Sequence, residues 1–243
     1  MTMNYGKLYL IPTTLGDYDP ADVLPRTTLD VIPKISTWVV EETRTARRFL
    51  SRAGMKGKIE SLDFHELNEH TTPSEVSAML PLFEDGGDVG YMSEAGLPAV
   101  ADPGAQLVAL CHEHGIRVVP MVGPSSLMLA LMASGLNGQS FAFIGYIPAK
   151  TEERRAAIRK VEATSSRERQ TQILIETPYR NDAMLRDLAT FCRPGTRITI
   201  AAELTLPTET IRTMTAEKWK RLIDNEKEPF SIGKRPCVFL LLA

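Results

Sequence analysis

The sequence predicts an α/β protein of two domains, because apolar strand-like runs alternate with helical segments along 243 residues. Runs such as 36–40 and 89–92 have the length and composition of buried strands. Repeated strand–helix alternation favours a mostly parallel sheet covered by helices. The alternation restarts after the polar segment 136–140, so we expect an N-terminal domain over residues 1–138 and a C-terminal domain over 139–243.

In the first half, the expected strands and helices follow from apolar runs and from their capping residues. Thr72, Pro73 and Glu75 form a capping box that opens a helix, and Asp102 with Pro103 predicts another helix start. The expected strands are 7–11, 36–40, 59–64, 89–92 and 116–122, and the expected helices are 21–35, 43–54, 72–86, 102–114 and 125–134.

The second half predicts a mixed sheet, because its strands are not regularly separated by helices. The expected strands are 141–147, 171–175, 196–202, 209–214 and 237–243, and the expected helices start at residues 151, 179 and 215.

The loop 93–104 is the first candidate site. It follows an expected strand and carries Glu94, Gly96 and Asp102. In open parallel sheets, ligands bind where loops leave the carboxyl ends of strands. The alternative is an ordinary strand-to-helix loop in which Asp102 only caps the next helix.

Two further polar loops follow strands of the same expected sheet. Glu42 and Arg44 are either site residues or an exposed ion pair of little energetic weight. His65 and Glu69 lie in a segment of side chains that can transfer protons. Their spacing matches no familiar set of metal ligands, so we predict no metal site.

Composition excludes several classes of protein. No apolar run approaches the ~20 residues of a membrane helix, and residues 1–12 do not have the pattern of a secretory signal. The three cysteines are far apart, which is typical of a reducing cytosol, so we expect a cytoplasmic protein without membrane association. Residues 1–138 hold 10 cations and 17 carboxylates, whereas the remainder is basic. That remainder either faces a polyanion or forms a solvated surface.

Eight segments in order resemble the tetrapyrrole-methylase superfamily of S-adenosylmethionine-dependent methyltransferases, and most closely its small-subunit rRNA (cytidine-2′-O)-methyltransferase I family. The segments are LYLIPTTLGD, EETRTARRFL, FHELNE, MSEAGLPAVADPG, VGPSSLMLALMASGL, FIGYIPAK, IETPYR and AAELT. The resemblance implies two α/β domains with the methyl donor in the cleft between them, a homodimer, and no metal. It also implies that the donor contacts Pro12, Ser93, Glu94, Ala95, Gly96, Ser125, Ser126, Glu176 and Leu204.

The sequence departs from this family mainly at the segments expected to face the methyl acceptor, the molecule that receives the methyl group. Leu67 replaces the second histidine of a HEHN motif, and Ala149 replaces the arginine of a PRK motif. The family also commonly carries a C-terminal helical extension after the last strand. Three functions stay open: methylation of a ribose 2′-hydroxyl in small-subunit rRNA or in a ribosomal subunit, methylation of a tetrapyrrole or other small molecule, and a non-catalytic donor-binding or RNA-binding role. For methyl transfer, the predicted catalytic set is Glu42, Arg44, Glu69 and Lys150.

Overall fold

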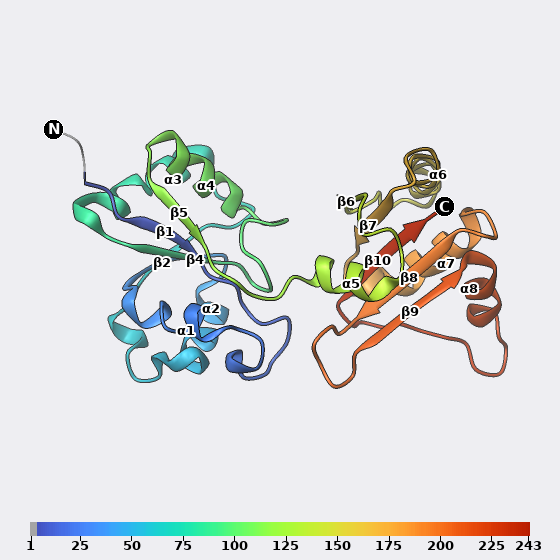
Figure 1. Cartoon of the computed structure of the whole chain (residues 1–243), viewed down its shortest axis with the longest axis horizontal. Helices are drawn as coiled ribbons and strands as arrows, with labels where there is room; N and C mark the ends of the chain where they lie inside the picture. The colour runs from blue at the N-terminus through green and yellow to red at the C-terminus, as the bar shows by residue number, and fades with distance from the viewer. Residues whose placement is uncertain (1–3) are drawn as a thin grey trace. The chain divides into compact units, whose positions relative to one another are not determined.

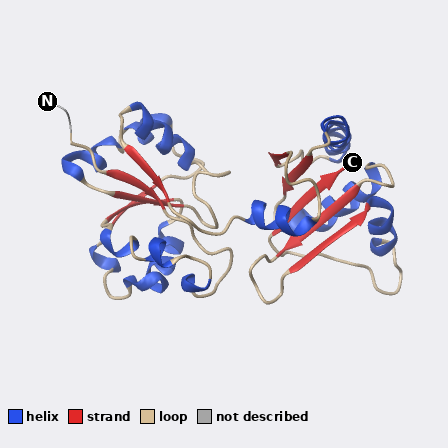
Figure 2. Ribbon diagram, in the orientation of Figure 1, coloured by secondary structure: helices blue, strands red, loops and turns tan. Residues whose placement is uncertain are grey.

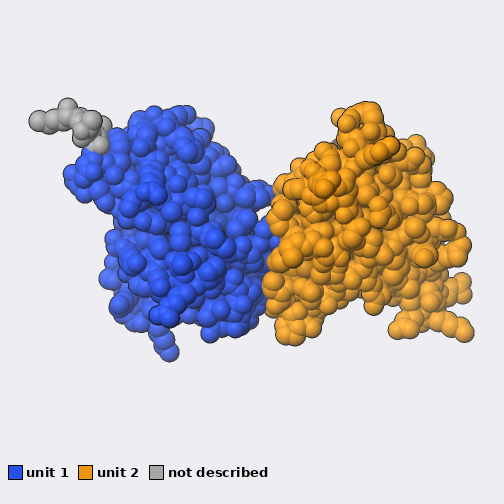
Figure 3. Space-filling view, viewed as in Figure 1, with its two compact units in different colours: residues 1–125 blue, residues 126–243 orange. Residues whose placement is uncertain are grey.

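The computed structural model describes residues 4–243. Contacts within the chain divide it into two compact units, residues 1–125 and 126–243 (Figure 3). Each unit has a five-stranded sheet with helices against it (Figure 2). The two α/β domains predicted from the sequence are therefore present.

The sheet of the first unit is entirely parallel, as the strand–helix alternation predicts. Its strands lie in the order β3-β2-β4-β1-β5, and the pairs β1–β4, β1–β5, β2–β3 and β2–β4 all run in the same direction. The bounds are β1 Lys7–Leu10, β2 Thr37–Val40, β3 Asp63–Glu66, β4 Val89–Met92 and β5 Arg117–Pro120.

Helices cover both faces of this sheet, so alternate residues of each central strand enter different cores (Figure 1). On β2, Val39 packs in the core with α3 and α4, whereas Trp38 and Val40 pack in the core with α2. Burial on both faces explains why these strands read as continuous apolar runs. The helices are α1 Arg26–Leu29, α2 Thr43–Leu50, α3 Pro73–Ser77 and α4 Gly104–Glu113.

The topology reverses between β1 and β4, which are neighbours in the sheet. The chain leaves β1 along the face of α1 towards β2, but leaves β4 along the face of α4 towards β5 (Figure 1). After its loop at the carboxyl edge, the chain that leaves β1 and the chain that leaves β4 therefore continue on opposite faces of the sheet. In open α/β sheets, this position is where ligands bind.

Several predicted boundaries in the first unit are wrong. Residues 21–35 are not one helix: short helical turns stand there, because the prolines at positions 25 and 33 lack an N–H. The third strand is Asp63–Glu66 rather than 59–64, so His65 lies within it. The capping box of Thr72 and Glu75 is confirmed, but α3 ends at Ser77 and a 3₁₀ segment follows.

The helix predicted from residue 102 begins at Gly104. Asp102 Oδ1 accepts hydrogen bonds from the Gly104 N–H and from the Tyr91 hydroxyl, both at 2.8 Å. A side chain at position 104 would collide with the Tyr91 ring, since a Cβ there would lie 1.9 Å from a ring carbon. Asp102 thus fixes the turn before the helix.

The second unit has the predicted mixed sheet, in the order β6-β7-β10-β8-β9. Only β6 and β7 are parallel; β10 pairs antiparallel with β7 and β8, and β9 pairs antiparallel with β8. The bounds are β6 Phe141–Gly145, β7 Thr171–Ile175, β8 Arg197–Ala202, β9 Thr210–Thr215 and β10 Cys237–Leu242.

Helices α6 Thr151–Glu168, α7 Asn181–Phe191 and α8 Ala216–Ile223 form one core with this sheet, and helix α5 Ser126–Ser134 packs against β8, β9 and β10. These contacts place α5 in the second unit, and the division falls at residue 125. The domain boundary expected from the sequence, between residues 138 and 139, stays a prediction. No helix within residues 4–243 has the length and apolar character needed to cross a membrane.

Candidate functional site

Three loops of the first unit meet at the carboxyl edge, beside the topological reversal. The Thr13 N–H donates a hydrogen bond to the Gly96 carbonyl at 2.9 Å, joining the loops after β1 and β4. Gly123, in the loop after β5, lies so close to Pro12 that a Cβ there would approach the proline Cβ to 2.2 Å. The structure therefore brings together the predicted donor contacts of this unit, which are Pro12, Ser93, Glu94, Ala95, Gly96 and Ser125.

Ser93 is a buried hydroxyl without a hydrogen-bond partner among the described residues. Its residue is only 8% exposed, and its Oγ contacts no donor or acceptor of residues 4–243. A buried polar group without a partner costs free energy unless something else satisfies it. The position therefore fits a site that a polar ligand completes.

The loop after β2 is tied to the loop after β4. Glu41 Oε2 accepts a hydrogen bond from the Glu94 N–H at 3.1 Å, and the Thr45 hydroxyl donates to the Glu94 carboxylate. Thr43 in turn donates from its hydroxyl to Glu66 Oε1 at 2.8 Å. The loops after β2 and β4 and the carboxyl end of β3 are thus connected by hydrogen bonds, and we refer to them as the polar edge.

Glu41 also belongs to this polar edge, although no pattern in the sequence singled it out. Burial, together with the nearby carboxylates of Asp102, Glu94 and Glu69, raises the pKa of Glu41 above its usual value. A carboxylate in such surroundings is a stronger proton acceptor than an exposed one. The adjacent Glu41 and Glu42 in the sequence gave no means of distinguishing the half-buried residue from the exposed one.

Glu42 caps helix α2. Its carboxylate accepts hydrogen bonds from the N–H groups of Arg44 and Thr45 at 2.9 and 2.7 Å, and these amides lower its pKa. The arrangement satisfies the helix terminus and makes Glu42 a weaker base. Arg44 lies exposed on the first turn of the same helix.

The other two proton-transfer candidates of this unit are exposed or paired. Glu69 is exposed and lies 3.7 Å from His70 Nε2, while its charge also acts on Glu41. His65 Nε2 lies 2.8 Å from the Asp63 carboxylate on the same strand. Glu69 therefore lies close enough to the polar edge to affect Glu41, whereas His65 is paired with Asp63. Within residues 4–243, no three side chains of the metal-ligating types gather at a possible metal site.

A hollow of about 180 Å³ opens beside these loops. Its walls come from the loop after β1, the loop after β4 and the exposed side of α2. The lining includes Thr13, Gly16, Thr45, Arg48, Arg52 and Glu94. Of the predicted site residues, Glu94 and Ala95 border this space, while Glu41, Glu42 and Ser93 line a smaller pocket that Glu94 and Thr45 share with it.

The second unit holds the remaining predicted residues, and three of their loops share one edge of its sheet. Strands β7 and β8 are antiparallel to β10, and β6 is parallel to β7. The carboxyl ends of β6, β7 and β8 therefore lie at the edge of the sheet where β10 begins. Lys150, Glu176 and Leu204 follow these three strands in turn. Lys150 is exposed and lies 3.4 Å from Glu153, and Ser126 is the first residue of α5.

Glu176 is a buried carboxylate, and only one of its two oxygens has a hydrogen-bond partner within residues 4–243. Oε1 accepts hydrogen bonds from the Thr177 N–H at 2.7 Å and from Arg180 at 2.6 Å. Oε2 is buried and has no partner among residues 4–243. Like Ser93 Oγ in the first unit, it is a buried polar atom that a polar ligand group could satisfy.

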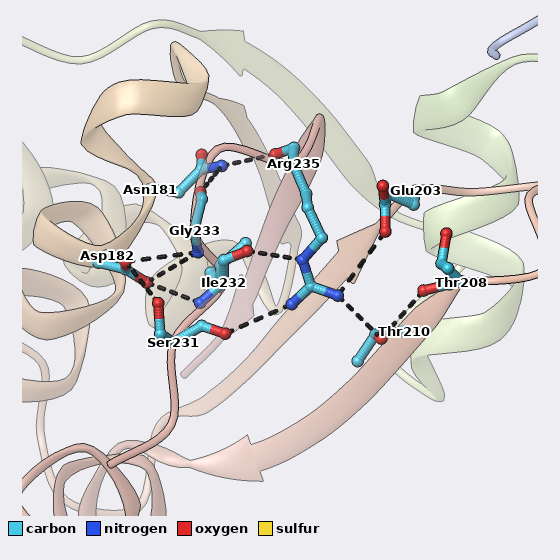
Figure 4. A network of polar contacts seen from close by, with 9 residues as sticks. All are labelled: Asn181, Asp182, Glu203, Thr208, Thr210, Ser231, Ile232, Gly233 and Arg235. Carbon is cyan, nitrogen blue, oxygen red and sulfur yellow. Dashed lines mark hydrogen bonds and ion pairs between the residues drawn. The ribbon is translucent and has the colours of Figure 1, made fainter. Parts of the chain in front are cut away.

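The residue before Leu204, Glu203, belongs to a network of polar contacts (Figure 4). Glu203 lies 3.8 Å from the Arg235 guanidinium, which also donates to the carbonyls of Ile232 and Ser231. Asp182 accepts from the N–H of Ile232 at 2.7 Å and so fixes the other side of the same segment. The Leu204 loop is therefore anchored to the segment that leads into β10.

Both candidate donor loops contain non-glycine residues with left-handed backbone. Ala99 and Ala101 have φ near 63° in the loop after β4, and Glu203 and Thr205 have φ of 52° and 70° around Leu204. Only two other non-glycine residues within 4–243 have positive φ. Such strained backbone concentrates at ligand-binding segments, because the surrounding fold must impose it.

Comparison with known proteins assigns the family. A model described as Tetrapyrrole (Corrin/Porphyrin) Methylases matches residues 22–219, across most of both units. The chain belongs to this methylase family. It is therefore an S-adenosylmethionine-dependent methyltransferase, as the sequence resemblance implies.

Tetrapyrrole methylase family members of known sequence include close relatives of this chain. The chain is 37% identical over 205 residues to "Ribosomal RNA small subunit methyltransferase I" of Neisseria meningitidis serogroup B, covering 84% of this chain and 66% of that protein. The protein of the same name from Escherichia coli O157:H7 is 33% identical over 206 residues, covering 85% and 68%. The chain thus spans about two thirds of the length of these relatives.

Solved methylase structures share the fold. The methyltransferase CobJ superposes with a TM-score of 0.60 at 17% identity, covering 98% of this chain and 94% of that one. Uroporphyrin-III C-methyltransferase from Thermus thermophilus, complexed with S-adenosyl homocysteine, gives 0.54 at 15% identity and covers 98% and 97%. At these identities the likeness establishes the two-unit α/β architecture.

Proposed function

We propose that this methyltransferase transfers the methyl group of S-adenosylmethionine to a ribose 2′-hydroxyl of small-subunit ribosomal RNA. The observation that carries the proposal is identity of 33–37% to small-subunit rRNA methyltransferases over about 205 residues, which extend through both units. The connected polar edge of the first unit supports it, since it offers a proton acceptor beside a hollow.

The residues of this chain fit the donor. S-adenosylmethionine, when bound, supplies a methyl group on a positively charged sulfonium and carries an ammonium and ribose hydroxyls. Ser93 Oγ and Glu176 Oε2 are buried polar atoms that lack partners within 4–243, and each can bind a polar group of such a ligand. The carboxylate of Glu94 can offset positive charge. That Pro12, Ala95, Gly96, Ser125, Ser126 and Leu204 also contact the donor stays a prediction.

The first unit can take up the proton that the reaction releases. A bond forms between the ribose oxygen and the methyl carbon, the carbon–sulfur bond breaks, and the hydroxyl proton must pass to a base. We assign this role to Glu41, because burial and neighbouring carboxylates raise its pKa above the usual value of a glutamate. Glu42, Arg44, Glu69 and Lys150 stay predicted to act on the acceptor, with Arg44 suited to phosphate.

A transfer assay tests this function. Purified protein is incubated with methyl-labelled donor and small ribosomal subunits from a strain that lacks the gene, and the RNA is then digested to nucleosides. We expect label in one 2′-O-methylnucleoside, identified by mass spectrometry. Naked small-subunit rRNA in a parallel reaction shows whether the folded subunit is required.

A tetrapyrrole acceptor is the competing outcome of the same assay. Uroporphyrinogen III replaces the RNA in a matched reaction, and the products are separated by chromatography. Label in the tetrapyrrole and none in RNA would reject the proposed acceptor while leaving the methyltransferase assignment in place.

We further propose that the chain acts as a homodimer in the cytoplasm. Strand β6 lies at one edge of its sheet. Large apolar residues are exposed on it and directly after it, with 36–61% of each residue accessible: Phe141, Phe143 and Ile144 in the strand and Tyr146 after it, referred to below as the exposed row of β6. Exposed apolar groups at a sheet edge favour association with a second copy.

The three cysteines are free and buried, which suits a reducing compartment such as the cytoplasm.

A further inference from the structure

The cations of the first unit are concentrated on one segment. Ten lysines and arginines lie in residues 1–125, and six of them fall within residues 44–58, which contain none of the carboxylates of this otherwise acidic unit. The six are Arg44, Arg47, Arg48, Arg52, Lys56 and Lys58, referred to below as the α2 basic segment. A local excess of positive charge on an acidic unit suggests a specific anionic partner.

The helix α2 separates these cations from the core. Ala46, Phe49 and Leu50 are buried against the sheet, whereas Arg44 and Arg48 are exposed. Arg44, Arg48 and Arg52 are spaced by four residues, so they follow one another along one side of the helix and the turn after it, about 6 Å apart along the axis. The protein thus presents a row of guanidinium groups to solvent.

Ion pairing within the protein does not account for the row. Within residues 4–243, Arg48 and Arg52 pair with Asp17, and Arg47 pairs with Glu60, so ion pairs to two carboxylates involve three of the six cations. These pairs are exposed, and exposed pairs add little to stability. Arg44 stands in the first turn of the helix, where a positive charge opposes the helix dipole. Stability therefore does not explain why the cations gather here.

The row of Arg44, Arg48 and Arg52 lies beside the candidate site. Arg48 and Arg52 line the hollow that Thr13 and Glu94 also border, and Thr45 of the same helix donates to Glu94. We propose that the α2 basic segment binds the sugar–phosphate backbone of the RNA acceptor and guides the target ribose to the edge of β1, β2 and β4. This inference rests on the proposed function for the class of acceptor and adds where that acceptor is held.

RNA is the occupant that charge and placement favour. Guanidinium groups bind phosphate by paired hydrogen bonds, and a chain of phosphates matches a row of cations better than a single small anion does. Contacts to the backbone position RNA without reading its sequence. The affinity should therefore depend steeply on salt and weakly on base sequence.

The salt dependence of RNA binding tests the inference. The probe is a fluorescent oligocytidylate of about twelve nucleotides, titrated at several salt concentrations with wild type and with the triple variant Arg48→Gln/Arg52→Gln/Lys56→Gln. Losing three phosphate contacts should reduce the slope of log K against log salt by about 2 and weaken binding by about tenfold to a hundredfold at low salt. Methylation of small-subunit rRNA should show a raised KM for RNA.

A matched control separates this surface from net charge. Arg26→Gln/Lys34→Gln/Arg117→Gln removes three other cations of the same unit, and it should keep the wild-type slope. Donor affinity by calorimetry checks that both variants are folded. Equal slopes in the two triple variants would overturn the inference, even with rRNA methylation intact. A wild-type protein that neither binds the oligonucleotide nor methylates rRNA would instead overturn the proposed function together with it.

Discussion

At the scale of single residues, two adjacent glutamates have opposite environments. Glu41 is half-buried among carboxylates and its pKa is raised, whereas Glu42 accepts two helix N–H groups and its pKa is lowered. Because the pKa of Glu41 is raised in the folded protein, ionisation of Glu41 lowers stability as the pH rises from the unfolded pKa through the folded pKa. Because the pKa of Glu42 is lowered in the folded protein, Glu42 contributes stability above the unfolded pKa and loses it as the pH falls through the folded pKa. The first is typical of a functional carboxylate and the second of a structural one.

We expect Glu41→Gln to lower the rate of methyl transfer by about 10²–10⁴, because the amide cannot accept the ribose proton. Donor affinity should change little, since the glutamine oxygen can still accept from the Glu94 N–H. Stability at neutral pH should not fall, because the substitution removes a charge that burial disfavours. Single-turnover rates, donor calorimetry and urea unfolding measure these three effects.

The pH profile of the rate distinguishes a base from a structural residue at this position. Wild-type rate should fall with decreasing pH through the raised pKa of Glu41, and this limb should vanish in Glu41→Gln. Glu113→Gln, an exposed carboxylate at the end of α4, serves as the control. A wild-type rate in Glu41→Gln would assign the proton transfer to another group.

At the scale of elements, helices α6 and α7 are joined by an ion pair shielded from water. Arg154 Nε donates to Asp187 Oδ2 at 2.6 Å, with side-chain exposures of 7% and 15%. The Arg154 guanidinium also donates to the Ala149 carbonyl at 3.0 Å, so it ties the segment before Lys150 to both helices. Removing one partner of such a pair leaves the other charge buried and uncompensated.

We expect Asp187→Ala to lower the free energy of unfolding by about 3 kcal/mol. Glu217→Ala breaks the exposed pair with Arg221 on α8 and should cost less than ~1 kcal/mol. Urea denaturation followed by circular dichroism gives both values. Equal costs for the two substitutions would show that the α6–α7 pair is effectively solvated.

At the scale of the whole molecule, assembly should depend on the exposed row of β6. We expect Phe143→Glu to convert a dimer into monomers, because a charge replaces an apolar group at the contact. Val100→Glu, an exposed apolar position in the first unit, should leave the dimer intact. Sedimentation velocity over a range of concentrations measures both. A strictly monomeric wild-type protein would contradict the proposed assembly.

The sequence by itself determined the fold class, the parallel and mixed sheets, the family and the capping box of Thr72 and Glu75. These features depend on local patterns: apolar runs, prolines and short capping motifs act over a few residues. The limits of proline-rich helices were less predictable. Pro25 and Pro33 lack the N–H that a continuous helix needs, so the segment 21–35 forms separate short turns.

Only the tertiary structure decided which polar residues share an environment. Glu41 and Glu42 are neighbours in sequence, yet one enters the edge beside Glu94 and the other caps a helix. Ser93 and Glu176 each keep a buried polar atom without a partner among residues 4–243. Burial and charge proximity arise from contacts between distant segments, and the pKa of a carboxyl group follows those contacts rather than the residue type.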